Sequence, residues 1–478
     1  MSTIVDRFAH CHRRDPDRPI LHLPASGEAL TAGTIWQAHL DWAQRLSDAG
    51  LRPGHVLIAA AGNRAATVPL FLAARACGLV WMPVDSGATA AEIAELERRY
   101  GAAATVWPGD RPATREALTA NVVVGNGLAA AKCYPAAAVM KLTSGSTDVP
   151  KATLTSEDQL VSDTTQLTAG MGLHPRDTQL AMIPLSHAYG LSVLLMPLLL
   201  QGTAIVLRET FAPDQLPLDA EQFAANSFPG VPLMFQHFLS KPPHRWPSSI
   251  TRILSAGAPL PLEVARRFRE RFGVKVRSFY GTTESGGITY DGGDDENQDT
   301  VGTPLPGVTV TLVPDDGAPE GSGRIHVRSA GVSSGYAHGD GDGFGDGGYL
   351  TGDYGAFDDR GHLRLTGRAS SFVNVAGRKV RPLEVEQVLR SMPGIRDARV
   401  LPGSDPRRGE QVVACIVPDP AGEAPAPVDV RRFCWARLAA HKIPRAFIFL
   451  PRLPLTARGK VDRQVLETLV RAELDRSQ

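Results

Sequence analysis

The stretch Leu142-Thr143-Ser144-Gly145-Ser146-Thr147-Asp148-Val149-Pro150-Lys151 decides how the rest of the chain is interpreted. It gathers hydroxyl side chains around one glycine and ends in a lysine. Small residues let backbone N–H groups approach an anion, hydroxyl groups donate to it, and the ammonium adds a point charge. The stretch predicts a phosphate-binding loop, with a plain turn and a solvated lysine as the alternative. It is not a Walker A loop, because no glycine precedes Lys151 and no Ser or Thr follows it.

The length and composition are those of a soluble globular protein with more than one domain. A chain of 478 residues is too long for one ordinary core, so two or three domains are expected. Hydrophobic residues make up 43% of the chain and charged residues 21%. Because 50 basic residues balance 50 acidic ones, the charge argues against a nucleic-acid partner held by a general electrostatic field.

The cysteines and the apolar segments predict a cytoplasmic protein with no membrane span. Five scattered cysteines without a C-x-x-C pair are typical of reduced thiols. Residues 1–14 contain no apolar core, so no signal peptide is expected. The most apolar segment, residues 190–207, is interrupted by Pro197 and Gly202, which predicts a buried helix, a turn and a strand.

The first part of the chain alternates helical and strand patterns, which is typical of a parallel sheet covered by helices. Helices are expected at residues 34–49 and 67–76, and strands at 55–60, 80–84, 180–183, 204–207, 250–254 and 275–280. We therefore expect an α/β fold, with a large N-terminal domain of mixed and parallel sheets between helices.

In the later part of the chain the alternating helix and strand pattern gives way to short β runs. Short β runs at residues 308–313 and 323–327 indicate a β subdomain over about 307–368. Beyond it, helices are expected at 383–389 and 428–438 and strands at 397–401 and 411–417. These elements predict a small α+β module, large enough for a core of its own.

Two further motifs follow predicted strands and suit a nucleotide. Ser255-Ala256-Gly257-Ala258-Pro259-Leu260 offers small residues against which an adenine could lie, although a plain strand-to-helix turn explains it equally well. Tyr280-Gly281-Thr282-Thr283-Glu284 places a flat aromatic ring beside a glycine, two hydroxyl groups and a carboxylate. Such residues can stack on a purine, bind a phosphate and hold Mg²⁺.

A third motif suits a ribose. Asp353 in Tyr349-Leu350-Thr351-Gly352-Asp353 could accept both ribose hydroxyl groups, as acidic residues of dinucleotide folds do. Arg368 follows a Thr-Gly pair shortly afterwards. A pair of solvated turn residues is the alternative for both.

The order and spacing of these motifs resemble the adenylate-forming superfamily, which includes acyl-CoA synthetases, peptide-synthetase adenylation domains and luciferases. The resemblance implies that Tyr280 stacks on adenine, Thr283 contacts the α-phosphate and Glu284 binds Mg²⁺. It implies that Asp353 and Arg368 hold the ribose. The remaining nucleotide contacts implied are Thr143, Ser144, Gly145, Ser146, Thr147, Lys151, Gly257, Ala258, Gly281 and Thr282.

The resemblance also implies a mobile lid. Lys460, in Pro454-Leu455-Thr456-Ala457-Arg458-Gly459-Lys460, would bridge the carboxylate and the ribose-phosphate region during adenylation. After rotation, Gly377 would line a channel for a pantetheine thiol, although a plain turn glycine is the alternative. The implied division is an AMP-binding domain at 1–368, a hinge at 369–371 and a lid at 372–478.

Similarity to the acyl-pocket segment of the superfamily points to His187 in Pro184-Leu185-Ser186-His187-Ala188-Tyr189-Gly190, with Val231, Gly257, Gly281 and Gly286 as further candidates. Amino-acid-specific relatives place an aspartate near here, whereas this segment has none. The expected substrate is therefore an acyl or aryl acid that lacks an α-amino group. A histidine buried in the core is the alternative for His187.

The activity implied is an acid–thiol ligase that uses ATP and Mg²⁺ and delivers the acyl group to CoA. One alternative is a stand-alone adenylation enzyme that loads the phosphopantetheine arm of a carrier protein. Another is a catalytically silent nucleotide or acyl sensor. The chain departs from the family pattern at Asp148, where glycine is usual, and at the hinge residue Ser370, where Asp or Lys is usual.

Overall fold

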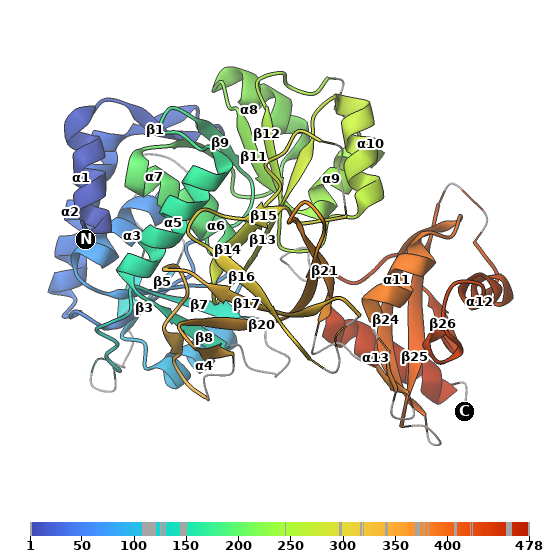
Figure 1. The fold of residues 1–478 in the computed structure, drawn as a ribbon. Helices are drawn as coiled ribbons and strands as arrows, with labels where there is room; N and C mark the ends of the chain where they lie inside the picture. Colours follow the sequence, from blue (N-terminus) through green and yellow to red (C-terminus); the bar gives the residue numbers. More distant parts are fainter. Residues whose placement is uncertain are drawn as a thin grey trace. The chain divides into compact units, whose positions relative to one another are not determined.

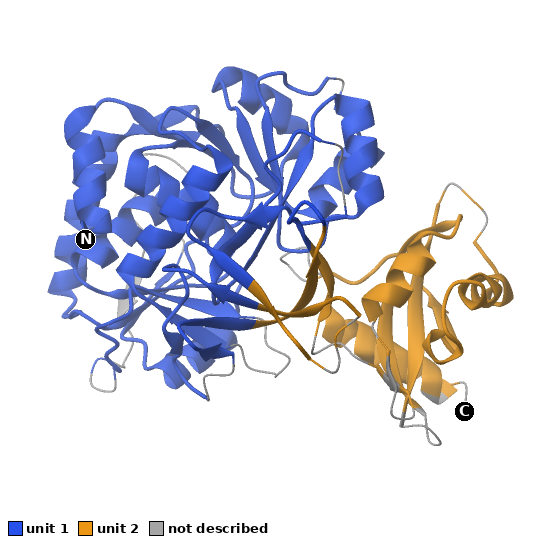
Figure 2. Ribbon diagram, viewed as in Figure 1, with its two compact units in different colours: residues 1–310, 326–350, 359–363 blue, residues 311–325, 351–358, 364–478 orange. Residues whose placement is uncertain are grey.

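A computed structural model of the chain divides into two compact units (Figures 1 and 2). It describes residues 2–107, 121–124, 128, 131–143, 151–243, 245–295, 299–315, 318, 320–339, 343–368, 373–375, 378–380, 382–405, 409–420, 422, 424–455 and 461–476. Unit 1 comprises residues 1–310, 326–350 and 359–363, and unit 2 comprises 311–325, 351–358 and 364–478. The mixed α/β sheets of a large N-terminal part and the smaller C-terminal part expected from the sequence are both present.

A nine-stranded sheet in unit 1 has the order β15-β14-β13-β12-β11-β9-β10-β1-β2. Its strands are β1 (Pro19–Leu23), β2 (Glu28–Thr31), β9 (Thr178–Ala181), β10 (Ala204–Leu207), β11 (Ser227–Gly230), β12 (Arg252–Ser255), β13 (Val276–Thr282), β14 (Gly286–Tyr290) and β15 (Thr303–Pro304). The strands from β13 to β1 run parallel, and β2, β14 and β15 pair antiparallel at the two edges.

A seven-stranded sheet in the same unit has the order β18-β8-β7-β4-β3-β5-β6. Its strands are β3 (Val56–Ala59), β4 (Val80–Pro83), β5 (Ala104–Trp107), β6 (Asn121–Val124), β7 (Val139–Thr143), β8 (Lys151–Thr155) and β18 (Gly335–Tyr336). The central strands are parallel, whereas β7–β8 and β8–β18 are antiparallel. The sequence predicted the βαβ rhythm but not these antiparallel pairs.

Helices of unit 1 flank the sheets (Figure 1). They are α1 (Ile4–Arg14), α2 (Ala32–Asp48), α3 (Thr67–Ala76), α4 (Ala90–Tyr100), α5 (Glu157–Met171), α6 (Ala188–Gly190), α7 (Met196–Gln201), α8 (Leu216–Gln222), α9 (Pro232–Ser240) and α10 (Leu262–Phe272), with single turns η3 (Leu191–Leu195) and η4 (Pro213–Gln215).

Helix α5 has well-defined ends. Ser156 and Gln159 form a reciprocal capping box at its start, and Gly172 ends it in the left-handed region. The helix therefore begins directly after β8, which fixes its first turn beside the strand that carries Lys151.

The apolar segment 190–207 folds as predicted into a buried helix, a turn and a strand. It contains the π-helical turn η3, helix α7 and strand β10, with Gly202 in the left-handed region at the end of α7. Within the part of the chain that the structure describes, no helix is both long enough and apolar enough to cross a membrane.

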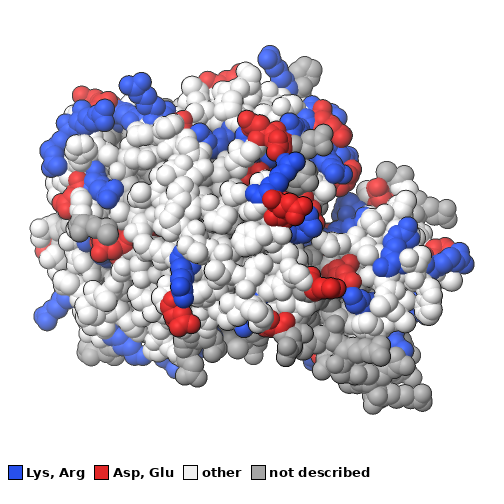
Figure 3. Space-filling view, in the orientation of Figure 1, with Lys and Arg blue, Asp and Glu red and all other residues white. Residues whose placement is uncertain are grey.

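The β-rich part contains β16 (Thr309–Val313), β17 (Gly323–Arg328), β19 (Phe344–Gly345), β20 (Gly348–Phe357) and β21 (Leu363–Arg368). β19 and β20 form an antiparallel hairpin in which Phe344 lies opposite Tyr349. On the face shown in Figure 3, basic and acidic residues lie near one another around a broad area of uncharged residues.

The C-terminal part of unit 2 contains a sheet of order β23-β22-β25-β24, with β26 parallel to β25. Its elements are β22 (Val373–Val375), β23 (Arg378–Val380), α11 (Pro382–Arg390), β24 (Ile395–Asp405), β25 (Gly409–Pro418), α12 (Pro427–Trp435), η6 (Ala440–Lys442), β26 (Ala446–Phe449) and α13 (Arg463–Arg476).

Strand β25 is buried on both faces. Val412, Ala414 and Ile416 join an apolar cluster that includes residues of α11 and α12, whereas Val413 and Cys415 join a second cluster that includes residues of α13. Alternation along the strand produces these two faces, so the module has a core on each side of its sheet.

Candidate functional site

Strands β7 and β8 have one apolar face and one polar face. Met140 and Ala152 pack in the apolar cluster of the seven-stranded sheet. Because neighbouring residues in a strand point to opposite faces, Lys141, Thr143 and Lys151 lie on the other face. Thr143 stands directly opposite Lys151 in this pair, and its hydroxyl donates to the Lys151 carbonyl at 3.3 Å. The two described ends of the predicted phosphate loop therefore meet. Ser144, Gly145, Ser146 and Thr147, like Asp148, lie outside the described residues.

The loop after β13 holds a buried carboxylate. Glu284 is 9% exposed, and its backbone carbonyl accepts the N–H of Ser333 at 2.8 Å. Thr282 Oγ1 accepts the N–H of Ser285 at 3.1 Å, so the loop is a hydrogen-bonded turn. Thr283 is half-buried in this turn. A carboxylate held so far from bulk water needs a partner.

Tyr336 on β18 supplies that partner. Its hydroxyl donates to Glu284 Oε1 at 2.8 Å, and the Lys151 ammonium lies 5.1 Å from the centroid of its ring. Burial raises the pKa of the Tyr336 hydroxyl far above its usual value. The hydrogen bond with Tyr349 and the charge of Glu284 act in the same direction. The hydroxyl therefore stays protonated and remains a donor at neutral pH. The structure brings Lys151 and Glu284 together around one tyrosine.

A second pair of charges lies beside this cluster. Lys141 and Asp163 are each 4% exposed. Burial lowers the pKa of Lys141 and raises the pKa of Asp163, and their mutual attraction opposes both shifts. The charge of Glu284 also acts on Lys141. Burial therefore outweighs the attraction between Lys141 and Asp163, and Asp163 also accepts the backbone N–H of Gly287 on β14.

Close backbone approaches shape the predicted adenine side of the site. Tyr280 is 8% exposed on β13. A β-carbon at Gly281 would lie 2.5 Å from the Gly286 carbonyl oxygen, so only glycine fits there. Gly257 has φ +82°, and a β-carbon on it would contact the Val231 side chain at 3.8 Å. The structure thus brings Val231 and Gly257 together, and it leaves Gly257 and Ala258 exposed.

His187 lies at the start of α6 as its N-cap residue and is half-buried. The carbonyl of His187 accepts the N–H of Leu191 at 2.8 Å. Tyr189, two residues later, packs its ring 5.7 Å from that of Phe279 on β13. The predicted acyl-pocket segment is therefore joined to the strand that carries Tyr280, whereas the role of His187 stays a prediction.

Asp353 and Arg368 meet within unit 2. Arg368 Nε donates to Asp353 Oδ1 at 2.5 Å. The Asp353 side chain is 8% exposed and the Arg368 side chain is 67% exposed, so the carboxylate is fixed from its solvent side. The structure pairs the two residues that the sequence analysis assigned to the ribose. Lys460, Gly377 and Ser370 lie outside the described residues.

Sequence reasoning missed Tyr336, Lys141 and Asp163. Polar and apolar residues alternate in Lys141–Thr143 and Lys151–Thr155, which was a signal for Lys141. A strand with one polar face next to the predicted phosphate loop would direct the Lys141 side chain to the same face as Lys151. Tyr336 had no such signal. It reaches the site because β18 pairs with β8, placing Tyr336 opposite Thr153.

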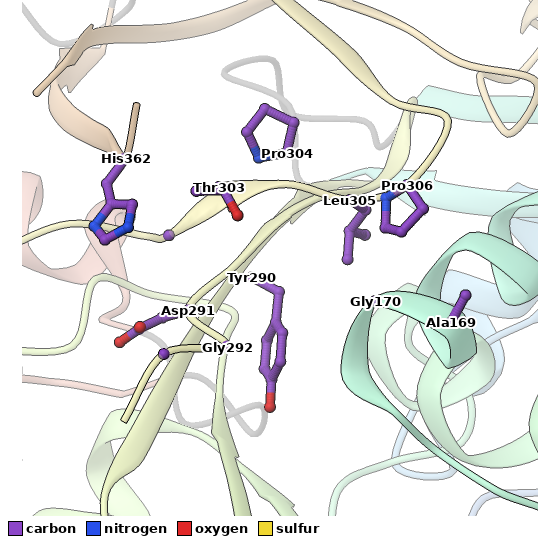
Figure 4. A pocket seen from close by; sticks show the side chains of 12 residues that line it. Ala169, Gly170, Tyr290, Asp291, Gly292, Thr303, Pro304, Leu305, Pro306 and His362 are labelled. Atoms are coloured by element: carbon purple, nitrogen blue, oxygen red, sulfur yellow. The ribbon is translucent and has the colours of Figure 1, made fainter. Parts of the chain in front are cut away.

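A hollow of about 390 Å³ lies elsewhere in unit 1 (Figure 4). Residues of the end of α5, β14, β15 and the following loops line it, and Tyr290, Asp291 and His362 are among them. None of its lining residues is a predicted site residue. The described site is therefore defined by side-chain contacts around Tyr336 and not by this hollow.

Two family models and several full-length relatives match this chain over most of its length. The family model "AMP-binding enzyme" matches residues 8–337, and "AMP-binding enzyme C-terminal domain" matches residues 384–460. A sulfoacetate–CoA ligase of Cupriavidus necator is 30% identical over 94% of each chain. A feruloyl-CoA synthase of an Amycolatopsis species is 28% identical over 91% of this chain and 93% of its own. The crystal structure of ATP-bound MatB from Rhodopseudomonas palustris has a TM-score of 0.85 and 25% identity, and covers 97% of this chain and 98% of its own.

Proposed function

The chain belongs to the AMP-binding enzyme family, and from that premise we propose that it joins a carboxylic acid to CoA at the expense of ATP, through the residues assigned below. It is an AMP-forming acid–thiol ligase, as its relatives are. The observation that carries the residue assignment is the contact of Lys151 and Glu284 with the same side chain, Tyr336. These two residues come from motifs far apart in the sequence.

The reaction has two halves. In the first, a carboxylate oxygen attacks the α-phosphorus of ATP, and the bond to the β-phosphate breaks, so that pyrophosphate leaves. In the second, a pantetheine thiolate attacks the acyl carbon, and the bond to AMP breaks. Both reactants of the first half are anions, so the site must neutralise charge as pyrophosphate leaves.

The charged residues of the site suit that task. The Lys151 ammonium and the loop at 143–147 would bind the β- and γ-phosphates, and Thr283 would donate to the α-phosphate. Tyr280 would stack on adenine, beside Gly257 and Ala258. Asp353 would accept the ribose hydroxyl groups, because its carboxylate is already oriented by Arg368.

Glu284 fits Mg²⁺. Magnesium prefers oxygen ligands and is usually bound by one or two carboxylates together with substrate phosphates and water. Among the described residues, no group of three or more His, Cys, Asp or Glu side chains gathers around a metal-sized space. A single buried carboxylate that shares Tyr336 with the Lys151 side chain is a donor set that suits magnesium. The ion would neutralise phosphate charge when bound.

Lys460 and Gly377 complete the proposal from the sequence. Lys460 would orient the carboxylate during adenylation, and Gly377 would line the thiol channel after the lid at 372–478 has rotated about the hinge at 369–371. The lid would thus serve two catalytic arrangements in turn.

The acyl acceptor is proposed to be CoA. The names of the relatives above end in CoA ligase or CoA synthase, which favours CoA over a carrier protein. The acid is proposed to lack an α-amino group, because the segment around His187 has no carboxylate to pair with an ammonium. The five unbridged thiols support a cytoplasmic location.

Exchange of labelled pyrophosphate into ATP tests the first half-reaction. We expect exchange that depends on an added acid, in a screen over aryl, short and medium-chain carboxylic acids. A silent nucleotide or acyl sensor would give no exchange with any acid. CoA and a pantetheinylated carrier protein are then compared as acceptors. Faster thioester formation on the carrier protein than on CoA would favour the alternative, a stand-alone adenylation enzyme that loads a carrier protein.

A further inference from the structure

Three aromatic side chains form a cluster in unit 1, and one of them, Tyr336, contacts the carboxylate of Glu284. The ring of Phe344 lies between Tyr336 and Tyr349, at centroid distances of 5.2 Å and 4.8 Å. Phe344 and Tyr349 also face one another across the β19–β20 hairpin. The ring of Tyr336 therefore has an aromatic neighbour whose position is set by backbone pairing.

The backbone of Tyr336 is also held firmly. Strand β18 pairs with β8, and the N–H groups of Ser334 and Ala337 donate to the carbonyls of Leu154 and Ala152, each at 2.8 Å. Lys151 begins the same strand β8. Tyr336 and Lys151 thus lie on adjacent, hydrogen-bonded strands, which restricts the position of the ring relative to the lysine.

The hydroxyl of Tyr336 has two oxygen neighbours. It donates to Glu284 Oε1 at 2.8 Å, and it lies 3.4 Å from the Tyr349 hydroxyl. The shorter of the two contacts, to the carboxylate, is the one in which Tyr336 is the donor. A hydrogen bond to a charged carboxylate is among the stronger ones in proteins and carries a defined direction.

The ring face of Tyr336 meets a cation. The Lys151 ammonium lies 5.1 Å from the ring centroid, within the range of cation–π attraction. A lysine side chain has four rotatable bonds, so such a contact reduces the number of positions that its ammonium samples.

We propose that Tyr336 is a positioning residue of the nucleotide site, which orients the Glu284 carboxylate through its hydroxyl and the Lys151 ammonium through its ring. The inference rests on the proposed roles of Glu284 and Lys151. Neither the sequence motifs nor the family match assigns this task to Tyr336. Its two functional groups act separately, so they can be removed separately.

The test measures ATP binding by calorimetry on the full chain, in excess Mg²⁺ and in EDTA. The ratio of the two affinities is the magnesium advantage. Tyr336→Phe removes the hydroxyl and keeps the ring, whereas Tyr336→Leu removes both. Tyr134→Phe is the matched control, because its hydroxyl donates to the Tyr100 carbonyl at 3.3 Å away from the aromatic cluster. Thermal unfolding of each variant verifies that it folds.

For Tyr336→Phe we expect the magnesium advantage to fall about tenfold while binding in EDTA is unchanged, since one hydrogen bond to a charged group is lost. For Tyr336→Leu we expect a further loss of about two- to fivefold in EDTA, because Lys151 also loses its ring. Tyr134→Phe should match the wild type in both conditions.

Two results would overturn the inference. One is a Tyr336→Phe protein with the magnesium advantage of the control. The other is an equal weakening in Mg²⁺ and EDTA with lowered thermal stability, which indicates a purely structural tyrosine. Glu284→Gln separates this failure from failure of the proposed function. If Glu284→Gln loses the advantage and Tyr336→Phe keeps it, only the positioning role is wrong. If Glu284→Gln also keeps it, the metal assignment itself is wrong, and the role of Tyr336 with it.

Discussion

Asp163 Oδ1 accepts the backbone N–H of Gly287 at 2.8 Å, which ties helix α5 to strand β14, directly after the loop that carries Glu284. The other carboxylate oxygen accepts the hydroxyl of Ser192, also at 2.8 Å. Lys141 on β7 supplies the compensating charge. A buried carboxylate on α5 therefore holds the backbone of β14, next to the loop that carries Glu284.

The first prediction concerns this buried pair. Lys141→Met and Asp163→Asn should each lower the free energy of unfolding by about 3 kcal/mol, because each leaves an uncompensated buried charge. The double variant should lose clearly less than the sum, since neither charge remains. Denaturant unfolding of the four proteins measures the coupling. Additive losses would mean that the two side chains act independently.

The second prediction concerns Gly286, which has φ +72°. A β-carbon there would lie 2.3 Å from Asp163 Oδ1. Gly286→Ala should therefore cost about 3 kcal/mol of unfolding free energy, from backbone strain and overpacking together. Gly273→Ala is the control. Gly273 has φ +73° at the end of α10, and no atom lies within 4 Å of its added β-carbon.

The control variant should lose only about 1 kcal/mol, the cost of the left-handed backbone alone. Denaturant unfolding gives both values. Equal losses in the two variants would show that the Asp163 contact does not restrict Gly286.

The third prediction concerns the ribose. The wild-type enzyme should bind 2′-deoxy-ATP more weakly than ATP, whereas Asp353→Asn should bind both nucleotides with similar affinity, because an amide accepts fewer hydrogen bonds than a carboxylate. Arg368→Ala should raise the KM for ATP about tenfold and change stability by less than about 1 kcal/mol, since its side chain is 67% exposed.

Arg98→Ala is the matched control for Arg368→Ala. Its side chain is 74% exposed and pairs with Glu95 on α4. Steady-state kinetics with ATP and 2′-deoxy-ATP measure the nucleotide preference and the KM, and denaturant unfolding measures the stability. A KM for ATP in Arg368→Ala equal to that of Arg98→Ala would remove Arg368 from the ribose site.

The fourth prediction concerns the lid. Lys460→Ala should slow adenylation at least about a hundredfold, a typical result of removing one group that stabilises developing charge. Thioester formation from supplied acyl-adenylate should stay near the wild-type rate. Single-turnover measurements of each half separate the two. Arg463→Ala is the control, because Arg463 is 50% exposed and pairs with Glu467 on α13. An equal decrease in both halves would contradict the two-arrangement lid.

Much of the fold could be predicted because local pattern determines local structure. The expected helix at 67–76 has those bounds in the structure, and the expected strand at 204–207 also matches. Proline and glycine interrupted the apolar segment 190–207 in the sequence, and the chain turns at Gly202. Such signals act within a few residues, where periodicity and turn chemistry are decisive.

The motifs of the site could also be predicted, since each is a short run with its own chemistry. The candidate phosphate loop and the Tyr280–Glu284 turn were identified from neighbouring residues, whereas Arg368 was assigned by family resemblance, and the roles of all these residues stay predictions.

The tertiary structure alone decided which charges and rings meet. Tyr336 lies opposite Thr153 although 183 positions separate their residue numbers, and Asp163 reaches Gly287 across 124 positions. Sheet pairing and burial bring these residues together, and neither leaves a periodic trace in the sequence. The sequence by itself therefore determined the local secondary structure, whereas packing between distant segments determined which residues contact the buried charges.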